Sequence, residues 1–89
     1  MAGGWRRARR RRRLAGELAV IWCEVLGRER VGPREEFLEL GGDSVAAIRI
    51  IGRAEELTGV ELSIRLLLET GTIAGMAERL ERIVAGEEP

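Results

Sequence analysis

The chain has 89 residues, which is enough for one small domain and too few for a second hydrophobic core. It contains no histidine and one cysteine, so histidine-based catalysis, histidine metal sites, cysteine-based zinc clusters and an internal disulfide are excluded within the chain. The formal net charge is zero, but seven of the fifteen arginines lie between Arg6 and Arg13. From Leu14 onward eight arginines stand against fifteen acidic residues, a net charge of −7.

The first thirteen residues are therefore predicted to be a separate basic and disordered tail. Two interpretations of its arginines stay open: a solvated segment, or electrostatic contact with an acidic partner or nucleic acid. A nucleic-acid-binding protein is the more distant alternative, because the rest of the chain is acidic. No apolar run approaches the roughly 20 residues that span a bilayer, and Glu17 interrupts the stretch that could have formed a signal peptide. We expect a cytoplasmic monomer without a nucleic-acid or membrane partner.

Apolar residues recur every three or four positions along the chain, which predicts an all-α fold. Four helices are predicted, over residues 14–26, about 44–58, 64–69 and 73–84. Val45, Ile48, Ile51 and Leu57 are expected to face inward in the second helix. The predicted architecture is a small four-helix bundle, with three main helices and one short helix. It forms a domain over residues 14–86, followed by a C-terminal tail over residues 87–89.

A long connection over residues 28–43 joins the first two predicted helices. Connections longer than about 12 residues in a compact domain are usually functional. Phe37 and Leu40 are expected to hold this connection on the bundle. Gly41 and Gly42 lack side chains, so another protein could approach closely at its end.

Ser44 follows this connection at the predicted start of the second helix, where unpaired N–H groups and the helix dipole favour an attached phosphate. The Asp43 carboxylate could meet a basic residue or a metal-bound water of an incoming enzyme. With no histidine in the chain to act as a base, the Ser44 hydroxyl is better suited to be another enzyme's substrate than a catalytic nucleophile.

The sequence Leu40-Gly41-Gly42-Asp43-Ser44 resembles the phosphopantetheine attachment motif of carrier proteins. The resemblance extends over about residues 14–84 and is to peptidyl carrier (thiolation) domains of nonribosomal peptide synthetases. The further matching segments are Ile21-Trp22, Val25-Leu26-Gly27, Ile48-Arg49, Gly59-Val60-Glu61-Leu62, Leu67-Leu68-Glu69 and Thr72-Ile73-Ala74.

This resemblance implies a carrier with the carrier-protein fold and no catalytic activity of its own. A phosphopantetheinyl transferase would attach 4′-phosphopantetheine from coenzyme A to Ser44, making the chain a phosphoprotein. An adenylating enzyme would then load an amino or aryl acid as a thioester. Condensation, tailoring or thioesterase enzymes would receive this cargo in natural-product biosynthesis, for example of an antibiotic. An aryl or polyketide-type acyl carrier is the nearer alternative.

Partner enzymes are expected to contact a surface around Ser44, formed by Val45, Ile48, Arg49 and Leu67. Val45, Leu68 and Gly71 depart from the residues usual in the family, which leaves the partners' identity open. Fatty-acid carriers are less similar because their second helix is distinctly acidic, whereas this one has Arg49 and Arg53. The initiating methionine and the end of the chain just past the fourth helix predict a free-standing protein.

Overall fold

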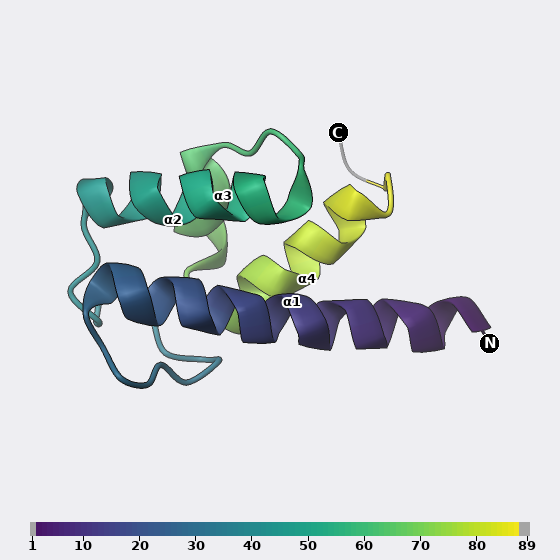
Figure 1. The fold of residues 1–89 in the computed structure, drawn as a ribbon, viewed down its shortest axis with the longest axis horizontal. Helices are drawn as coiled ribbons and strands as arrows, with labels where there is room; N and C mark the ends of the chain where they lie inside the picture. The colour runs from purple at the N-terminus through teal and green to yellow at the C-terminus, as the bar shows by residue number, and fades with distance from the viewer. Residues whose placement is uncertain (1, 88–89) are drawn as a thin grey trace.

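The computed structural model describes residues 2–87, which form four helices (Figure 1). Their bounds are α1 Ala2–Leu26, α2 Ser44–Thr58, α3 Ile64–Thr70 and α4 Ile73–Val84. The described residues contain no strand, so the predicted all-α fold is confirmed. The α1 helix contacts α2 and α4, while α3 contacts α2 and α4. The α2 helix runs back along the C-terminal half of α1, as Figure 1 shows.

The helix ends are determined by local backbone chemistry. Asp43, Ser63 and Thr72 accept hydrogen bonds from N–H groups in the first turns of α2, α3 and α4. Gly59 and Gly71 follow α2 and α3 in the left-handed conformation, which side-chain-bearing residues rarely adopt. The predicted boundaries of the second to fourth helices agree with these ends to within one residue.

The core lies where the four helices meet, and its centre is an aromatic pair. Trp22 of α1 and Phe37 of the connection pack edge to face, with ring centroids 5.6 Å apart. Both side chains are buried, as is Leu40. The connection between α1 and α2 is therefore held on the bundle as expected.

The inward face of α2 differs from the expectation. The α2 side chains that are buried are Ala46, Ala47, Ile50, Ile51 and Ala54. Val45 is 64% exposed and Ile48 is 62% exposed, so their predicted burial is wrong, and Leu57 is only partly covered. Small alanine side chains let α2 lie close to its neighbours, and this closeness determines which face of the helix is buried.

The largest correction concerns the first thirteen residues. α1 begins at Ala2, twelve residues before the predicted start, so the segment expected to be a disordered tail is helical from residue 2 onward. Arginine is a good helix former, and no proline occurs before Pro33. Arg7 and Arg10 also form ion pairs with Glu87 and Glu81, at or just beyond the end of α4. These tertiary contacts extend the helix where an apolar stripe is missing.

The shape of the molecule follows from this extension. At 1.5 Å per residue, α1 is about 37 Å long, which accounts for the 39 Å length of the molecule. Its N-terminal half projects beyond α2 (Figure 1). None of the described helices is both long and apolar enough to cross a membrane.

Candidate functional site

Ser44 is the first residue of α2, and Asp43 prepares this helix end. The Asp43 carboxylate oxygen Oδ1 accepts a hydrogen bond of 2.9 Å from the Ala46 N–H. The Asp43 carbonyl accepts the first bond of the helical pattern, from the Ala47 N–H at 2.9 Å. The N–H groups of Ser44 and Val45 precede this bond and have no helical acceptor. They leave a partial positive charge beside the Ser44 side chain.

The Ser44 side chain is exposed and its hydroxyl makes no hydrogen bond with any described residue. Asp43 is the N-cap of α2, so the Ser44 hydroxyl is not needed to cap the helix. The predicted contact of the Asp43 carboxylate with a basic residue or a metal-bound water would form only with an incoming enzyme. In the described part of this chain, His, Cys, Asp and Glu form no group that could hold a metal.

The connection before Ser44 is fixed to the bundle by hydrogen bonds. The Phe37 N–H donates to the Gly71 carbonyl at 2.8 Å, and the Ala74 N–H donates to the Pro33 carbonyl at 2.9 Å. The Arg28 guanidinium donates to the Leu40 carbonyl at 3.2 Å. The first two bonds join the connection to the turn between α3 and α4, so the approach to Ser44 is ordered although it has no regular secondary structure.

Each glycine before Asp43 has its own structural role. Gly41 has a φ of +86°, which only glycine adopts without strain. A Cβ on Gly42 would lie 2.5 Å from three carbons of the Phe37 ring. The two glycines place no side chain beside Ser44, as expected. In addition, Gly41 allows the turn and Gly42 allows the packing of the Phe37 ring.

Three of the four predicted partner-surface residues are exposed: Val45, Ile48 and Arg49. The fourth, Leu67, is completely buried and cannot touch a partner, so this prediction is corrected. Its neighbour Leu68 is 56% exposed instead. Residues 66–68 are three successive leucines, so the sequence pattern does not indicate which of them faces outward.

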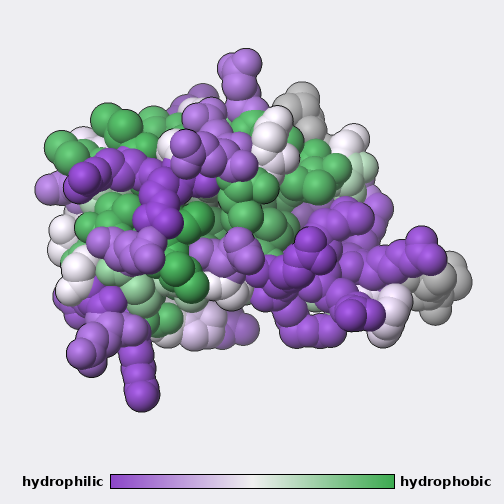
Figure 2. Space-filling model, viewed as in Figure 1, coloured by the Kyte–Doolittle hydropathy of each residue, from purple (hydrophilic) through white to green (hydrophobic). Residues whose placement is uncertain are grey.

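Leu38 was not predicted, although it is the most exposed large apolar side chain of the described residues, at 73%. It follows Phe37, whose bond to Gly71 places it near the end of α3. Figure 2 shows hydrophobic side chains on the part of the molecule that carries α2 and α3, with hydrophilic ones over the N-terminal half of α1.

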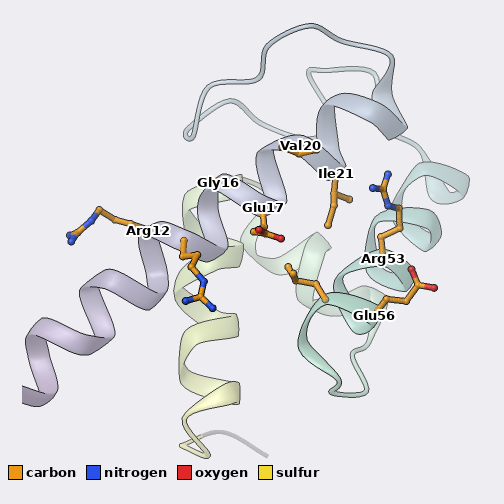
Figure 3. Close-up of a pocket in the computed structure, with 9 residues that line it drawn as sticks. Arg12, Gly16, Glu17, Val20, Ile21, Arg53 and Glu56 are labelled. Atoms are coloured by element: carbon orange, nitrogen blue, oxygen red, sulfur yellow. The ribbon is translucent and has the colours of Figure 1, made fainter.

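The groove between α1 and α2 lies away from Ser44. This open groove of about 550 Å³ is lined by Glu17, Val20, Arg53 and Glu56 among others (Figure 3). Its α2 residues belong to the second half of that helix, whereas Ser44 begins it. The site around Ser44 therefore offers an outward-facing hydroxyl that an enzyme can enclose.

A small helical bundle that presents one outward serine at the start of its second helix is the architecture of a carrier protein. The model of the family described as "Phosphopantetheine attachment site" matches residues 16–80 of this chain. The chain belongs to this family and is a peptidyl-type carrier of nonribosomal peptide synthesis. Its prosthetic group is 4′-phosphopantetheine, and it has no catalytic activity of its own.

Individual relatives agree with this assignment. BlmI, a type-II acyl-carrier-protein from Streptomyces verticillus involved in bleomycin biosynthesis, is 50% identical with a TM-score of 0.87, over 94% of this chain and 99% of BlmI. A peptidyl carrier protein solved with the phosphopantetheine transferase Sfp and coenzyme A is 29% identical with a TM-score of 0.70, covering 82% and 90% of the two chains. A dimodular nonribosomal peptide synthase from Bacillus subtilis is 48% identical over 64 residues. These are 72% of this chain but only 3% of the synthase, so the chain matches one small part of it.

Proposed function

We propose that Ser44 is the residue that carries the 4′-phosphopantetheine arm. The observation that supports this most directly is the exposed hydroxyl of Ser44 at the first position of α2, with Asp43 as the cap. The free N–H groups of that turn favour a phosphate on this oxygen. Gly41 and Gly42 leave room beside it, so the residues present fit the group.

In this proposal Ser44 acts as the accepting nucleophile in a transferase active site. Its Oγ forms a bond to the pantetheine-bearing phosphorus of coenzyme A, and the bond from that phosphorus to 3′,5′-ADP breaks. The hydroxyl proton passes to a base of the transferase, because this chain has no histidine. Once attached, the group supplies a thiol that holds an acyl group as a thioester.

The cargo we propose is an amino or aryl acid, loaded by an adenylating enzyme and passed to condensation, tailoring or thioesterase enzymes. The matched synthase is a nonribosomal peptide synthase by its name, and BlmI is described as involved in bleomycin biosynthesis. BlmI aligns over 99% of its length, which supports a carrier that acts as a separate protein. We place it as a monomer in the cytoplasm, where coenzyme A is available.

Mass spectrometry after incubation with coenzyme A, Mg²⁺ and a broad-specificity transferase tests the attachment residue. The chain has two serines, Ser44 and Ser63, and both are exposed at the start of a helix. The wild type and Ser63→Ala should each gain one phosphopantetheine, and Ser44→Ala should gain none. Modification of Ser44→Ala would contradict the proposal. A panel of adenylating enzymes and acids would then identify the cargo, and loading only by malonyl- or acetyl-type donors would favour the polyketide alternative.

A further inference from the structure

The N-terminal half of α1 carries an exposed concentration of positive charge that the carrier role does not use. Arginines occupy positions 6, 7 and 9–13, and all seven are exposed. Residues 5–13 are called the arginine segment below. Among the described residues only two of its arginines, Arg7 and Arg10, form ion pairs, and both face α4. The other five have no carboxylate partner within residues 2–87.

The concentration of positive charge in the arginine segment destabilises α1. Arginines three or four positions apart repel one another along one helix face. The five arginines without a carboxylate partner therefore do not stabilise the isolated chain, and an anionic partner would relieve this repulsion.

A groove beside the arginine segment indicates the chemistry of this partner. It has a volume of about 560 Å³ and lies between the N-terminal half of α1 and the last turns of α2 and α4. Its cationic lining includes Arg6, Arg9 and Arg13, and its apolar lining includes Leu57 and Val84. Leu57 is 36% exposed and Val84 is 41% exposed. An occupant that complements both kinds of lining would carry negative charges and apolar groups together.

Trp5 extends the apolar part of this groove. Its side chain is 58% exposed and lines the groove. The Arg9 guanidinium lies 4.9 Å from the centre of the Trp5 ring, a cation–π geometry that fixes both groups. Exposed tryptophan and arginine are the residue types enriched in protein–protein contacts.

We propose that the arginine segment and this groove bind an acidic amphipathic segment of a partner protein. Carboxylates on one face of such a segment would pair with Arg6, Arg9 and Arg13, and its apolar face would cover Leu57 and Val84. A nucleic acid fits less well, because it offers no apolar face for Leu57 and Val84. A lipid surface fits less well because the arginine segment has no continuous apolar face to insert.

The groove and Ser44 lie at opposite ends of α2. Ser44 begins this 15-residue helix and Thr58, which lines the groove, ends it. At 1.5 Å per residue the two ends are about 21 Å apart. A partner bound to the arginine segment would therefore leave the Ser44 surface open. Such binding would raise the effective concentration of the carrier near the enzymes that act on its cargo.

Fluorescence anisotropy with two labelled synthetic peptides tests the proposal on the full chain. One is a helical peptide of about 20 residues with glutamates on one face and leucines on the other. The second has the same charge, with glutamine in place of leucine. At about 0.15 M salt the amphipathic peptide should bind about tenfold more tightly than the polar one. Equal affinities would overturn the proposal, because they would show attraction by charge alone.

Three variants locate the binding on the structure. The double variant Arg9→Glu/Arg13→Glu should weaken binding of the amphipathic peptide by about tenfold or more. Its fold should persist, since both positions are exposed and glutamate is a good helix former, and circular dichroism checks this. Arg30→Glu/Arg34→Glu makes the same charge change in the exposed connection and should have little effect. Leu57→Gln/Val84→Gln should abolish the preference for the amphipathic peptide while keeping the weaker attraction by charge.

Two competing partners are measured in the same assay. Tighter binding to a short DNA duplex, or to vesicles containing anionic lipid, than to the amphipathic peptide would overturn the proposal in favour of that partner. Ser44→Ala should bind the peptide as the wild type does. This result separates the groove from the attachment site, because failure of either proposal leaves the measurement of the other unchanged.

Discussion

The Phe37 ring occupies the space that a side chain on Gly42 would need. Three of its carbons would lie 2.5 Å from a Cβ at that position, closer than any real contact. Phe37 has little room to move, because it is buried against Trp22. The Gly42 N–H also donates to the Phe37 carbonyl at 3.0 Å. Gly42 is therefore part of the packing that places Ser44, in addition to keeping the surface open.

Gly42→Ala should destabilise the fold because the connection or the Phe37 ring must shift. Overpacking of this kind costs about 1–3 kcal/mol, which chemical denaturation can measure. Gly52→Ala is the matched control, since Gly52 lies inside α2 with no atom within 4 Å of an added Cβ. It should stabilise the protein by about 0.5–1 kcal/mol. Equal stability of both variants would show that the ring adapts freely.

Ser44→Ala should leave the stability almost unchanged. Ser44 is inside the helix and Asp43 is the cap, so the substitution removes no capping bond and introduces a better helix former. Asp43→Ala should cost about 1 kcal/mol, because the Ala46 N–H loses its acceptor. Thermal unfolding of the two variants measures the contrast. A larger loss for Ser44→Ala would mean that its hydroxyl has a structural bond.

Arg10→Ala should destabilise the protein more than Arg12→Ala. The Glu81 side chain is only 5% exposed and is paired with Arg10, while the Arg10 side chain is 42% exposed. Loss of the partner leaves a buried carboxylate, at a cost of about 1–2 kcal/mol, because screening at Arg10 weakens the pair. Arg12 has no ion pair with the described residues, so its removal should change the stability by less than about 0.5 kcal/mol. Thermal unfolding of the two variants, compared with the wild type, measures this difference.

The same pair changes the expectation for the N-terminal segment. A disordered tail would be dispensable for folding, whereas deletion of residues 1–13 removes Arg10 from Glu81. We therefore expect the deletion to be at least as destabilising as Arg10→Ala. An unchanged melting temperature after deletion would contradict the role of the Arg10–Glu81 pair.

The sequence was most informative where one residue determines the local backbone. Asp43 and Thr72 at helix starts, and Gly59 at a helix end, act through their own hydrogen bonds or φ angle. These features need no knowledge of tertiary contacts, and the predicted boundaries agree with the structure. The segment Leu40 to Ser44 is a local pattern of the same kind, which is why the sequence alone could put Ser44 forward as the proposed attachment residue.

The sequence was least informative where contacts between elements determine which residues are buried or where a helix begins. Val45 and Ile48 are larger and more apolar than Ala46 and Ala47, yet the alanines are buried because α2 packs closely. The helical start of α1 depends on carboxylates about 70 or more positions away, such as Glu81. Hydrophobic periodicity along the sequence indicates neither how closely α2 packs nor which distant carboxylates pair with α1.

Leu67 and Leu68 should separate the contribution of the core from that of partner binding. Leu67 is fully buried, so Leu67→Ala should cost about 2–5 kcal/mol in stability. Leu68 is more than half exposed, so Leu68→Ala should leave the stability within about 0.5 kcal/mol. The Leu68 variant should instead slow loading by the cognate adenylating enzyme. Normal loading of a stable Leu68→Ala protein would remove α3 from the proposed partner surface.

Ile48 and Arg49 should affect partner recognition through different forces. An enzyme that accepts the arm proposed on Ser44 must cover the start of α2, where Ile48 lies about one helical turn away and is mostly exposed. Arg49 is also exposed, but it lines a groove between α1 and α2 together with Glu24 and Glu56. Ile48→Ala should therefore reduce the kcat/KM of loading by about tenfold through lost apolar contact. Arg49→Glu should weaken it by a smaller factor through charge.

Salt concentration distinguishes the two effects. The loss caused by Arg49→Glu should shrink as salt rises from about 0.05 M to about 0.5 M, because exposed charges are screened. The loss caused by Ile48→Ala should persist, since apolar contact is not screened. Both variants should be phosphopantetheinylated to completion, which confirms that Ser44 and the fold are intact. If both load as fast as the wild type at every salt concentration, the partner surface lies instead at the connection near Leu38, and Leu38→Ala becomes the variant expected to lose loading.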